Sequence, residues 1–152
     1  MKLKMILLLI LLFMITIGCS NAKSEGPLTK DRVAKATPAY SGLVPSLTLK
    51  QEDDVIHATF VIKNDSDHVI PLQFNTTQHF DYVIEDTSGK KVKQYSEGLM
   101  SGQIVTRPKL DKGEQLKYEE EIKGLLPGHY KLTIWLTDTT YKPKVSQSFI
   151  VQ

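Results

Sequence analysis

The chain of 152 residues has only one cysteine, Cys19, so it has no pair of thiols for an internal disulfide. A domain of about 100 residues can fold without such a crosslink if its apolar core is large enough. Hydrophobic residues make up 41% of the sequence, which is enough for a core of that kind. We therefore expect a domain stabilised by apolar packing alone.

The chain also lacks an apolar run long enough to span a bilayer. Its longest run, 5–17, would form a helix of about 20 Å, against a hydrocarbon core of about 30 Å. Lys2 and Lys4 precede the run and Gly18 ends it, which predicts a secretory signal peptide over residues 1–18. Because Cys19 follows at once, the segment resembles a bacterial lipoprotein signal.

In proteins with such a signal, the cysteine thiol is acylated and becomes the mature N-terminus. We therefore expect Cys19 to be the lipid attachment site, with two or more acyl chains for stable anchoring. The protein is then expected on the extracytoplasmic side of the cell membrane, held there by lipid. The alternative is an ordinary secreted protein in which Cys19 is unmodified.

The predicted mature chain has no excess of positive or negative charge. Removing Lys2 and Lys4 from the 19 basic residues leaves 17, against 17 acidic residues. The chain has no long run of basic residues either. Nucleic acid is therefore not expected as a partner.

Catalytic and metal-binding patterns are absent as well. The sequence has no G-x-S-x-G, H-E-x-x-H or glycine-rich phosphate loop. The four histidines are scattered singly at positions predicted to be outward or in turns, without partners at ligand spacing; they are His57, His68, His79 and His129. We therefore expect no enzyme activity, no metal site and no cofactor.

Helical periodicity is lacking from residue 45 onward, and an alternation of period two takes its place. Apolar residues alternate with polar ones in segments such as 56–63, 80–85, 130–136 and 145–151, and turn-forming residues separate them. The polar stretch 19–44 shows no sustained periodicity and predicts a flexible tether, with a short helix over 29–36 left open. The sequence thus predicts three parts: a signal peptide (1–18), a tether (19–44) and one domain (45–152).

The strand pattern of this domain is typical of an all-β, immunoglobulin-like antiparallel sandwich of about eight strands. Pro127-Gly128-His129-Tyr130 fits the entry to a late strand, and Tyr130 is expected to hydrogen-bond back across a corner. Residues 96–102 are predicted to form a loop and 103–107 a strand. Trp135 and Tyr95 are candidate interface aromatics, although packing into the sandwich remains an equal alternative for both.

Seven short pieces of the sequence, in order and spacing, resemble the BsuPI family, named for an intracellular proteinase inhibitor. Phe80-Asp81-Tyr82, followed by Gly89, Val92 and the Ser96-x-Gly98-x-Met100 pattern, is the more specific part. A tryptophan is common in the family between that valine and serine, and here Tyr95 stands in its place. The remaining pieces are 60–67, 72–74, 110–114 and 127–130.

The resemblance implies a small β-sandwich that binds and inhibits a serine proteinase by presenting a rigid exposed loop. The candidate partner-binding loop runs from Tyr95 to Gln103, where Leu99 or Met100 would offer an apolar side chain to a subtilisin-like pocket. Two alternatives stay open: Leu99 and Met100 cover the end of the sandwich, or the chain is a docking lipoprotein of the cell envelope or spore. The expected partner is accordingly an extracytoplasmic proteinase or another envelope protein.

Overall fold

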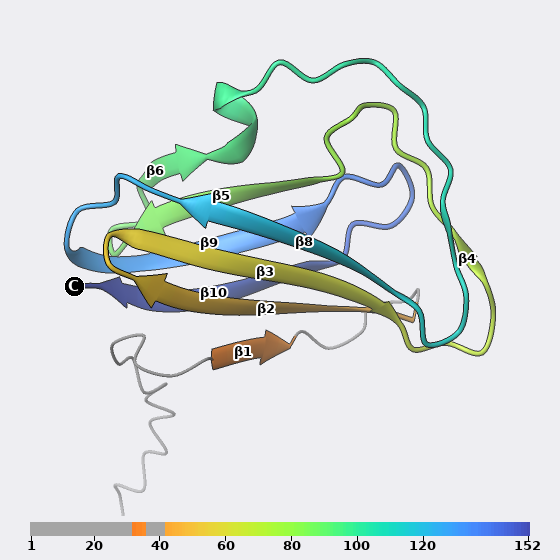
Figure 1. The fold of residues 1–152 in the computed structure, drawn as a ribbon, viewed down its shortest axis with the longest axis horizontal. Coiled ribbons are helices and arrows are strands. Elements are labelled where there is room, and N and C mark those ends of the chain that lie inside the picture. Colours follow the sequence, from red (N-terminus) through yellow and green to blue (C-terminus); the bar gives the residue numbers. More distant parts are fainter. Residues whose placement is uncertain (1–31, 36–41) are drawn as a thin grey trace, which may run out of the picture.

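The computed structural model describes residues 32–35 and 42–152, which form an all-β, immunoglobulin-like antiparallel sandwich (Figure 1). The first sheet has the strand order β1 (Arg32–Lys35), β2 (Leu43–Glu52), β3 (Val55–Asn64) and β8 (Gln115–Ile122). The second has the order β10 (Lys144–Val151), β9 (Gly128–Leu136), β5 (Phe80–Asp86) and β6 (Lys91–Gln94). A further antiparallel pair consists of β4 (Ile70–Pro71) and β7 (Lys109–Leu110).

The strands form where apolar and polar residues alternate. In β3, Ile56, Phe60 and Ile62 are buried between the sheets, while Lys63 is exposed. The same alternation buries one face of β5, β9 and β10. The strands predicted over 56–63, 80–85, 130–136 and 145–151 are therefore confirmed.

The strand order matches the two layers of an immunoglobulin-like sandwich, and a tyrosine corner joins them. The Tyr130 hydroxyl, at the start of β9, donates a hydrogen bond to the Leu126 carbonyl oxygen over 2.9 Å. The ring of Tyr130 meanwhile packs against Phe149 of the core, with ring centroids 5.8 Å apart. The corner expected from the sequence is confirmed.

The two edges of the sandwich differ. At one edge β10 packs against β1 and β2. At the other edge β8 and β6 are the outermost strands of their sheets, and the short 3-10 helix η1 (Tyr95–Gly98) directly follows β6. In Figure 1, β1 lies at the bottom of the sandwich, whereas η1 and the chain that follows it lie at the top.

Two fully buried polar residues hold the loops at the end of the sandwich near β4. The Asn64 amide nitrogen donates to the carbonyl oxygens of His68 and Leu110, at 2.8 and 2.9 Å. The Asp138 carboxylate accepts backbone hydrogen bonds from Gln73, Thr140 and Tyr141. Because each residue joins segments distant in sequence, the chain after β4 is fixed to both sheets.

Three expectations differ from the structure. The first sheet begins inside the predicted tether 19–44, because residues 32–35 pair with β2 and β2 starts at Leu43. Residues 32–35 are extended, so the helix considered over 29–36 is wrong there. Residues 103–107 form no strand. They lie beside another loop and not beside a sheet, so a single bridge between Thr106 and Phe74 is their only strand-like pairing within the described residues.

Candidate partner-binding loop

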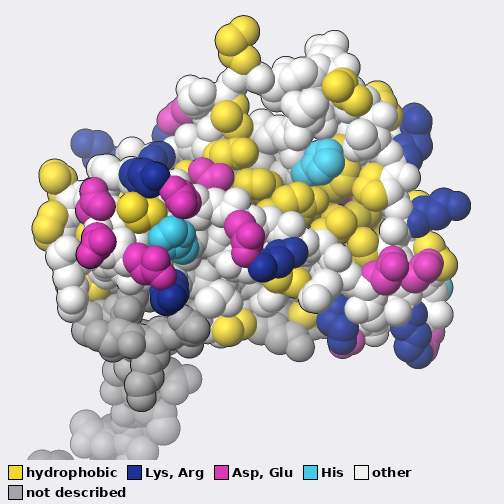
Figure 2. Space-filling model, in the orientation of Figure 1, with side chains coloured by type: hydrophobic (Ala, Val, Ile, Leu, Met, Phe, Trp, Pro, Cys, Tyr) yellow, Lys and Arg dark blue, Asp and Glu magenta, His cyan; other side chains and the backbone are white. Residues whose placement is uncertain are grey.

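The loop after η1 exposes the apolar side chains that the sequence singled out. Met100 is fully exposed, at 103% relative exposure, and Leu99 is 44% exposed. Figure 2 shows apolar side chains projecting from the top of the molecule, where Figure 1 places η1 and the following chain. Leu99 and Met100 therefore do not close the end of the sandwich.

Two more apolar residues on the same loop are exposed, namely Ile104 at 56% and Val105 at 51%. Together with Leu99 and Met100 they form what we call the 99–105 surface. Sequence reasoning missed Ile104 and Val105, because a strand over 103–107 would have buried one of the two. Single exposed apolar residues are ordinary, whereas four exposed apolar residues within seven positions make this loop the candidate binding surface.

Asp81 of β5 holds the N-terminal side of this loop. Its carboxylate accepts hydrogen bonds from the Ser96 backbone nitrogen (3.1 Å), the Ser96 hydroxyl (2.9 Å) and the Gln94 side-chain amide (3.1 Å). Asp81 is only 6% exposed, so these hydrogen bonds are well shielded from water. The Phe-Asp-Tyr and Ser-x-Gly-x-Met pieces of the sequence are thus in contact, because the aspartate of the first binds the serine of the second.

The C-terminal side of the loop is held by residues 72–77. The Gly102 backbone nitrogen donates to the Thr77 hydroxyl over 3.1 Å, and the Thr77 nitrogen donates to the Gly102 carbonyl oxygen over 3.0 Å. Further along, the backbones of Phe74 and Thr106 exchange two hydrogen bonds of 2.9 Å. Leu99 and Met100 thus lie between two fixed points, Ser96 and Gly102, while Ile104 and Val105 lie between Gly102 and the Thr106 bridge.

Tyr95 packs the start of the loop against the hydrophobic core. Its ring stacks on Phe80, with centroids 4.7 Å apart, and is tilted against Tyr82 at 5.4 Å. Burial raises the pKa of the Tyr95 hydroxyl, and the Glu120 and Asp81 carboxylates raise it further. Of the three residues predicted for the partner-binding loop, Leu99 and Met100 are free to contact a partner, while the partly buried Tyr95 packs against the core.

His79 was expected to be solvated, and the structure corrects this. Its ring stacks on Phe74, with centroids 4.2 Å apart, and meets the edge of Tyr118 at 6.3 Å. Its Nε2 lies 3.3 Å from the Thr106 hydroxyl, next to the backbone bridge that holds the loop. Burial lowers the pKa of the imidazole. The alternation over 80–85 begins only after His79, so no local pattern predicted this packing.

Trp135 faces away from the core, as the alternation of β9 predicts. Its neighbours Ile134 and Leu136 are buried, whereas Trp135 is partly exposed on the outer face of the second sheet. On that face it pairs across the strands with Asp81 and Lys144. It is therefore available for contact on the outer face of the second sheet, next to Asp81 in the neighbouring strand.

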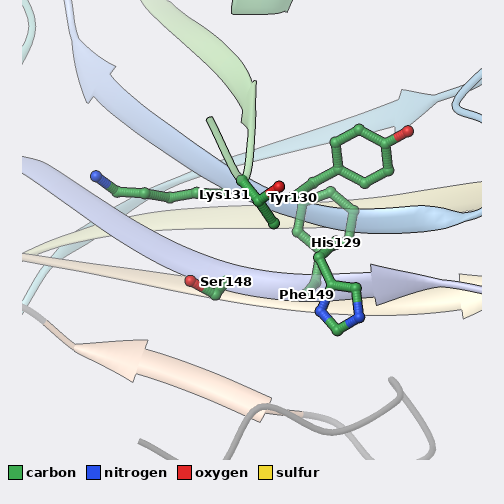
Figure 3. Close-up of a pocket in the computed structure, with 6 residues that line it drawn as sticks. His129, Tyr130, Lys131, Ser148 and Phe149 are labelled. Atoms are coloured by element: carbon green, nitrogen blue, oxygen red, sulfur yellow. The ribbon is translucent and has the colours of Figure 1, made fainter. Parts of the chain in front are cut away.

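Two shallow pockets lie on the sheets, and neither adjoins the 99–105 surface. One, of about 230 Å³, is lined by Thr87, His129, Tyr130, Lys131, Ser148 and Phe149. There the side chains of Lys131 and His129 point in different directions (Figure 3). The other, of about 390 Å³, lies over β3 and β8 and is lined by His57, Ala58, Thr59, Glu119, Glu120 and Glu121.

Several predictions concern other parts of the chain. Cys19, the predicted lipid attachment site, lies outside the described residues. Within 32–35 and 42–152, no helix has the length and apolarity needed to cross a membrane. In those same ranges, no group of three or more His, Cys, Asp or Glu side chains is placed to hold a metal ion.

The two sheets and the apolar loop held at both ends define a small all-β sandwich domain. A family model described as BsuPI, intracellular proteinase inhibitor, matches residues 43–141. The chain therefore belongs to the BsuPI family. The match spans the sandwich from the first residue of β2 to the turn before β10, and it includes the whole candidate loop.

Comparisons with other proteins add little to this assignment. No curated protein matches the chain. Among solved structures, the chain is similar to Bacteroides uniformis β-glucuronidase, with 14% identity and a TM-score of 0.39, covering 78% of this chain and 12% of that one. It is also similar to a DUF1425 family member from Shewanella sp. pv-4, with 14% identity and a TM-score of 0.33, covering 76% of this chain and 94% of that one.

Proposed function

We propose that this protein is a lipid-anchored, extracytoplasmic inhibitor of serine proteinases that binds its target through the 99–105 surface. Its membership of a proteinase inhibitor family supports the inhibitory role. The signal-like segment 1–18 and Cys19 support the location, although the family's description says intracellular. The target on this proposal is a proteinase outside the cytoplasmic membrane.

One observation carries the proposal: a fully exposed Met100 lies on a loop that is held at both ends. A loop that is ordered before binding loses little conformational entropy when a partner captures it. Anchor side chains that fill a partner's pocket supply most of the affinity of such interfaces. Rigidity and an available apolar anchor are the two properties that a proteinase-binding loop needs.

Titration of subtilisin with the purified full chain tests this function. We expect proteinase activity to fall to zero at a stoichiometric ratio. The Met100→Ala variant should bind at least about 30-fold more weakly, because it loses a pocket-filling side chain. The matched control is Leu126→Ala, which truncates a 77% exposed leucine between β8 and β9.

Two results would contradict the proposal. Undiminished subtilisin activity at a large molar excess would exclude inhibition of this class of proteinase. Degradation of the chain without a stable complex would show that it is a substrate. In either case a docking lipoprotein becomes the better account, to be pursued by a pull-down from the cell envelope.

A further inference from the structure

The part of the loop that can enter a partner's site is short. Ser96 is held by Asp81, and Glu97 forms an ion pair with Lys91 of β6. Gly102 is held by Thr77 on the other side. Only residues 98–101 therefore project between fixed positions.

Within this stretch, Met100 and Leu99 are not equivalent. The Leu99 backbone nitrogen donates to the Ser96 carbonyl oxygen over 3.4 Å, and more than half of the residue is covered. Met100 has no such restraint and is fully exposed. The Leu99 backbone is extended, with φ −111° and ψ 138°, which is the conformation in which peptides add alongside a partner's strand. Leu99 thus presents the next residue, Met100, outward.

We propose that Met100 is the residue that enters the specificity pocket of the target, and that Met100–Ser101 is the peptide bond presented to its catalytic serine. This inference rests on the proposed function and assigns its specificity. The target class is a serine proteinase with a deep, uncharged, apolar pocket. The unbranched thioether of Met100 can adapt to such a pocket, whereas a pocket with a buried carboxylate would be left with an unpaired charge.

The chemistry follows from this placement. The proteinase serine oxygen adds to the Met100 carbonyl carbon and its proton passes to the enzyme's base. The bond to the Ser101 nitrogen then breaks, and that nitrogen receives the proton and becomes an amine. One water molecule next releases the Met100 carboxylate from the enzyme, so complete cleavage consumes one water.

The two fixed points keep the cleaved ends together. The Asp81–Ser96 contacts retain the new carboxyl end, and the Thr77–Gly102 contacts retain the new amino end. The amine therefore stays close to the acyl carbon at a high effective concentration. Re-formation of the peptide bond returns the water, so the complex persists instead of turning over.

A change of specificity tests the inference. The full chain should inhibit subtilisin and not trypsin, whereas Met100→Lys should inhibit trypsin and lose at least about 100-fold in affinity for subtilisin. Leu126→Lys is the matched control, because it adds the same charge at another exposed apolar site, and it should behave as the unmodified chain. Met100 makes no contact with the core, so far-UV circular dichroism should be identical for all three proteins.

Mass spectrometry of the complex gives a second, independent result. After long incubation, the unmodified chain should show a single nick that creates a new N-terminus at Ser101. Thr77→Val, which removes one hydrogen-bond acceptor for Gly102, should make this nick accumulate faster. Both results would support the assignment.

The failures can be told apart. If the unmodified chain inhibits subtilisin and Met100→Lys does the same, the Met100 assignment is overturned and the inhibitor function stands. A first cleavage at any other bond would overturn it too. If the unmodified chain inhibits no serine proteinase, the proposed function fails and the assignment fails with it.

Discussion

Asp81 shows how one residue links the core to the candidate loop. Its carboxylate accepts hydrogen bonds from Tyr82, Gln94 and Ser96 while it is almost completely buried. Removing a buried acceptor leaves its donors without partners, which costs more than the hydrogen bonds contribute on balance. The aspartate of the Phe-Asp-Tyr piece is therefore explained by the position of the loop, not by catalysis.

Asp81→Ala is expected to lower the free energy of unfolding by about 2 kcal/mol. Urea denaturation followed by tryptophan fluorescence measures this change. Asp67→Ala is the control, because the Asp67 carboxylate is highly exposed and pairs with the exposed Lys112, so its loss should change stability by less than about 0.5 kcal/mol. Equal effects of the two substitutions would contradict the structural role of Asp81.

His79 should make stability depend on pH near neutrality. Burial lowers the pKa of His79 in the folded protein, so the unfolded chain binds more protons between the two pKa values. Stability is therefore expected to fall as pH decreases through about 6.5, the ordinary pKa of histidine. The groups packed against the ring are the Phe74 and Tyr118 rings and the Thr106 hydroxyl, none of which carries a charge near this pH.

The test compares unfolding free energies at pH 7.5 and pH 5.5. His79→Phe keeps an aromatic ring against Phe74 but cannot be protonated, so the decrease in stability should become smaller. His68→Gln replaces an exposed histidine and should leave the decrease unchanged. A decrease that survives in His79→Phe would show that another group is responsible.

At the scale of elements, local alternation was sufficient to predict the main strands but not the path of residues 102–108. The strands β3, β5, β9 and β10 each carry their own pattern of buried and exposed residues. The path of residues 102–108, in contrast, depends on hydrogen bonds to residues 72–77, about 30 positions earlier in the chain. No local pattern encodes that pairing, so the exposure of Ile104 and Val105 was not predicted.

The two short strands β1 and β4 also depend on pairings that no local sequence pattern encodes. Residues 32–35 hold only two weakly apolar positions, and their pairing with β2 is a tertiary contact. Ile70–Pro71 is a strand only because β7 lies beside it, and Pro71 is tolerated there because the pair is short and lies outside the two main sheets. Exposed Leu99 and Met100, by comparison, were correctly placed in a loop because Gly98 and Gly102 flank them.

Hydrogen exchange provides a prediction for the loop as an element. The amides of Phe74, Thr77 and Thr106 donate backbone hydrogen bonds and should exchange slowly. In the described structure the amides of Met100, Ser101 and Ile104 donate none, so they should exchange close to the rate of an unfolded peptide. Exchange measured by NMR would contradict the account if all six amides behaved alike.

At the scale of the whole molecule, β1 and the candidate loop lie on opposite sides of the sandwich in Figure 1. Residues 20–31 connect Cys19 to β1 and span at most about 40 Å when fully extended. If Cys19 carries lipid, β1 is the described strand nearest to the point of attachment along the chain. On the proposed function, the 99–105 surface, on the opposite side of the sandwich from β1, is the one that an extracytoplasmic proteinase would contact.

Lipid attachment at Cys19 is tested by labelling cells with radioactive palmitate. The unmodified chain should incorporate the label and sediment with membranes, because two or more acyl chains give stable anchoring. Cys19→Ala should lose both properties, while the neighbouring control Ser20→Ala should keep them. Labelled, membrane-bound Cys19→Ala protein would contradict the assignment.

The central claim is that this protein binds a serine proteinase through the loop that carries Met100, and a crystal structure of its complex with subtilisin tests it most directly. The account predicts the Met100 side chain inside the specificity pocket and the catalytic serine oxygen about 3 to 3.5 Å from the Met100 carbonyl carbon. A complex formed through Trp135 or through β8, with Met100 in solvent, would contradict the claim. So would the absence of any complex at micromolar concentrations of both proteins.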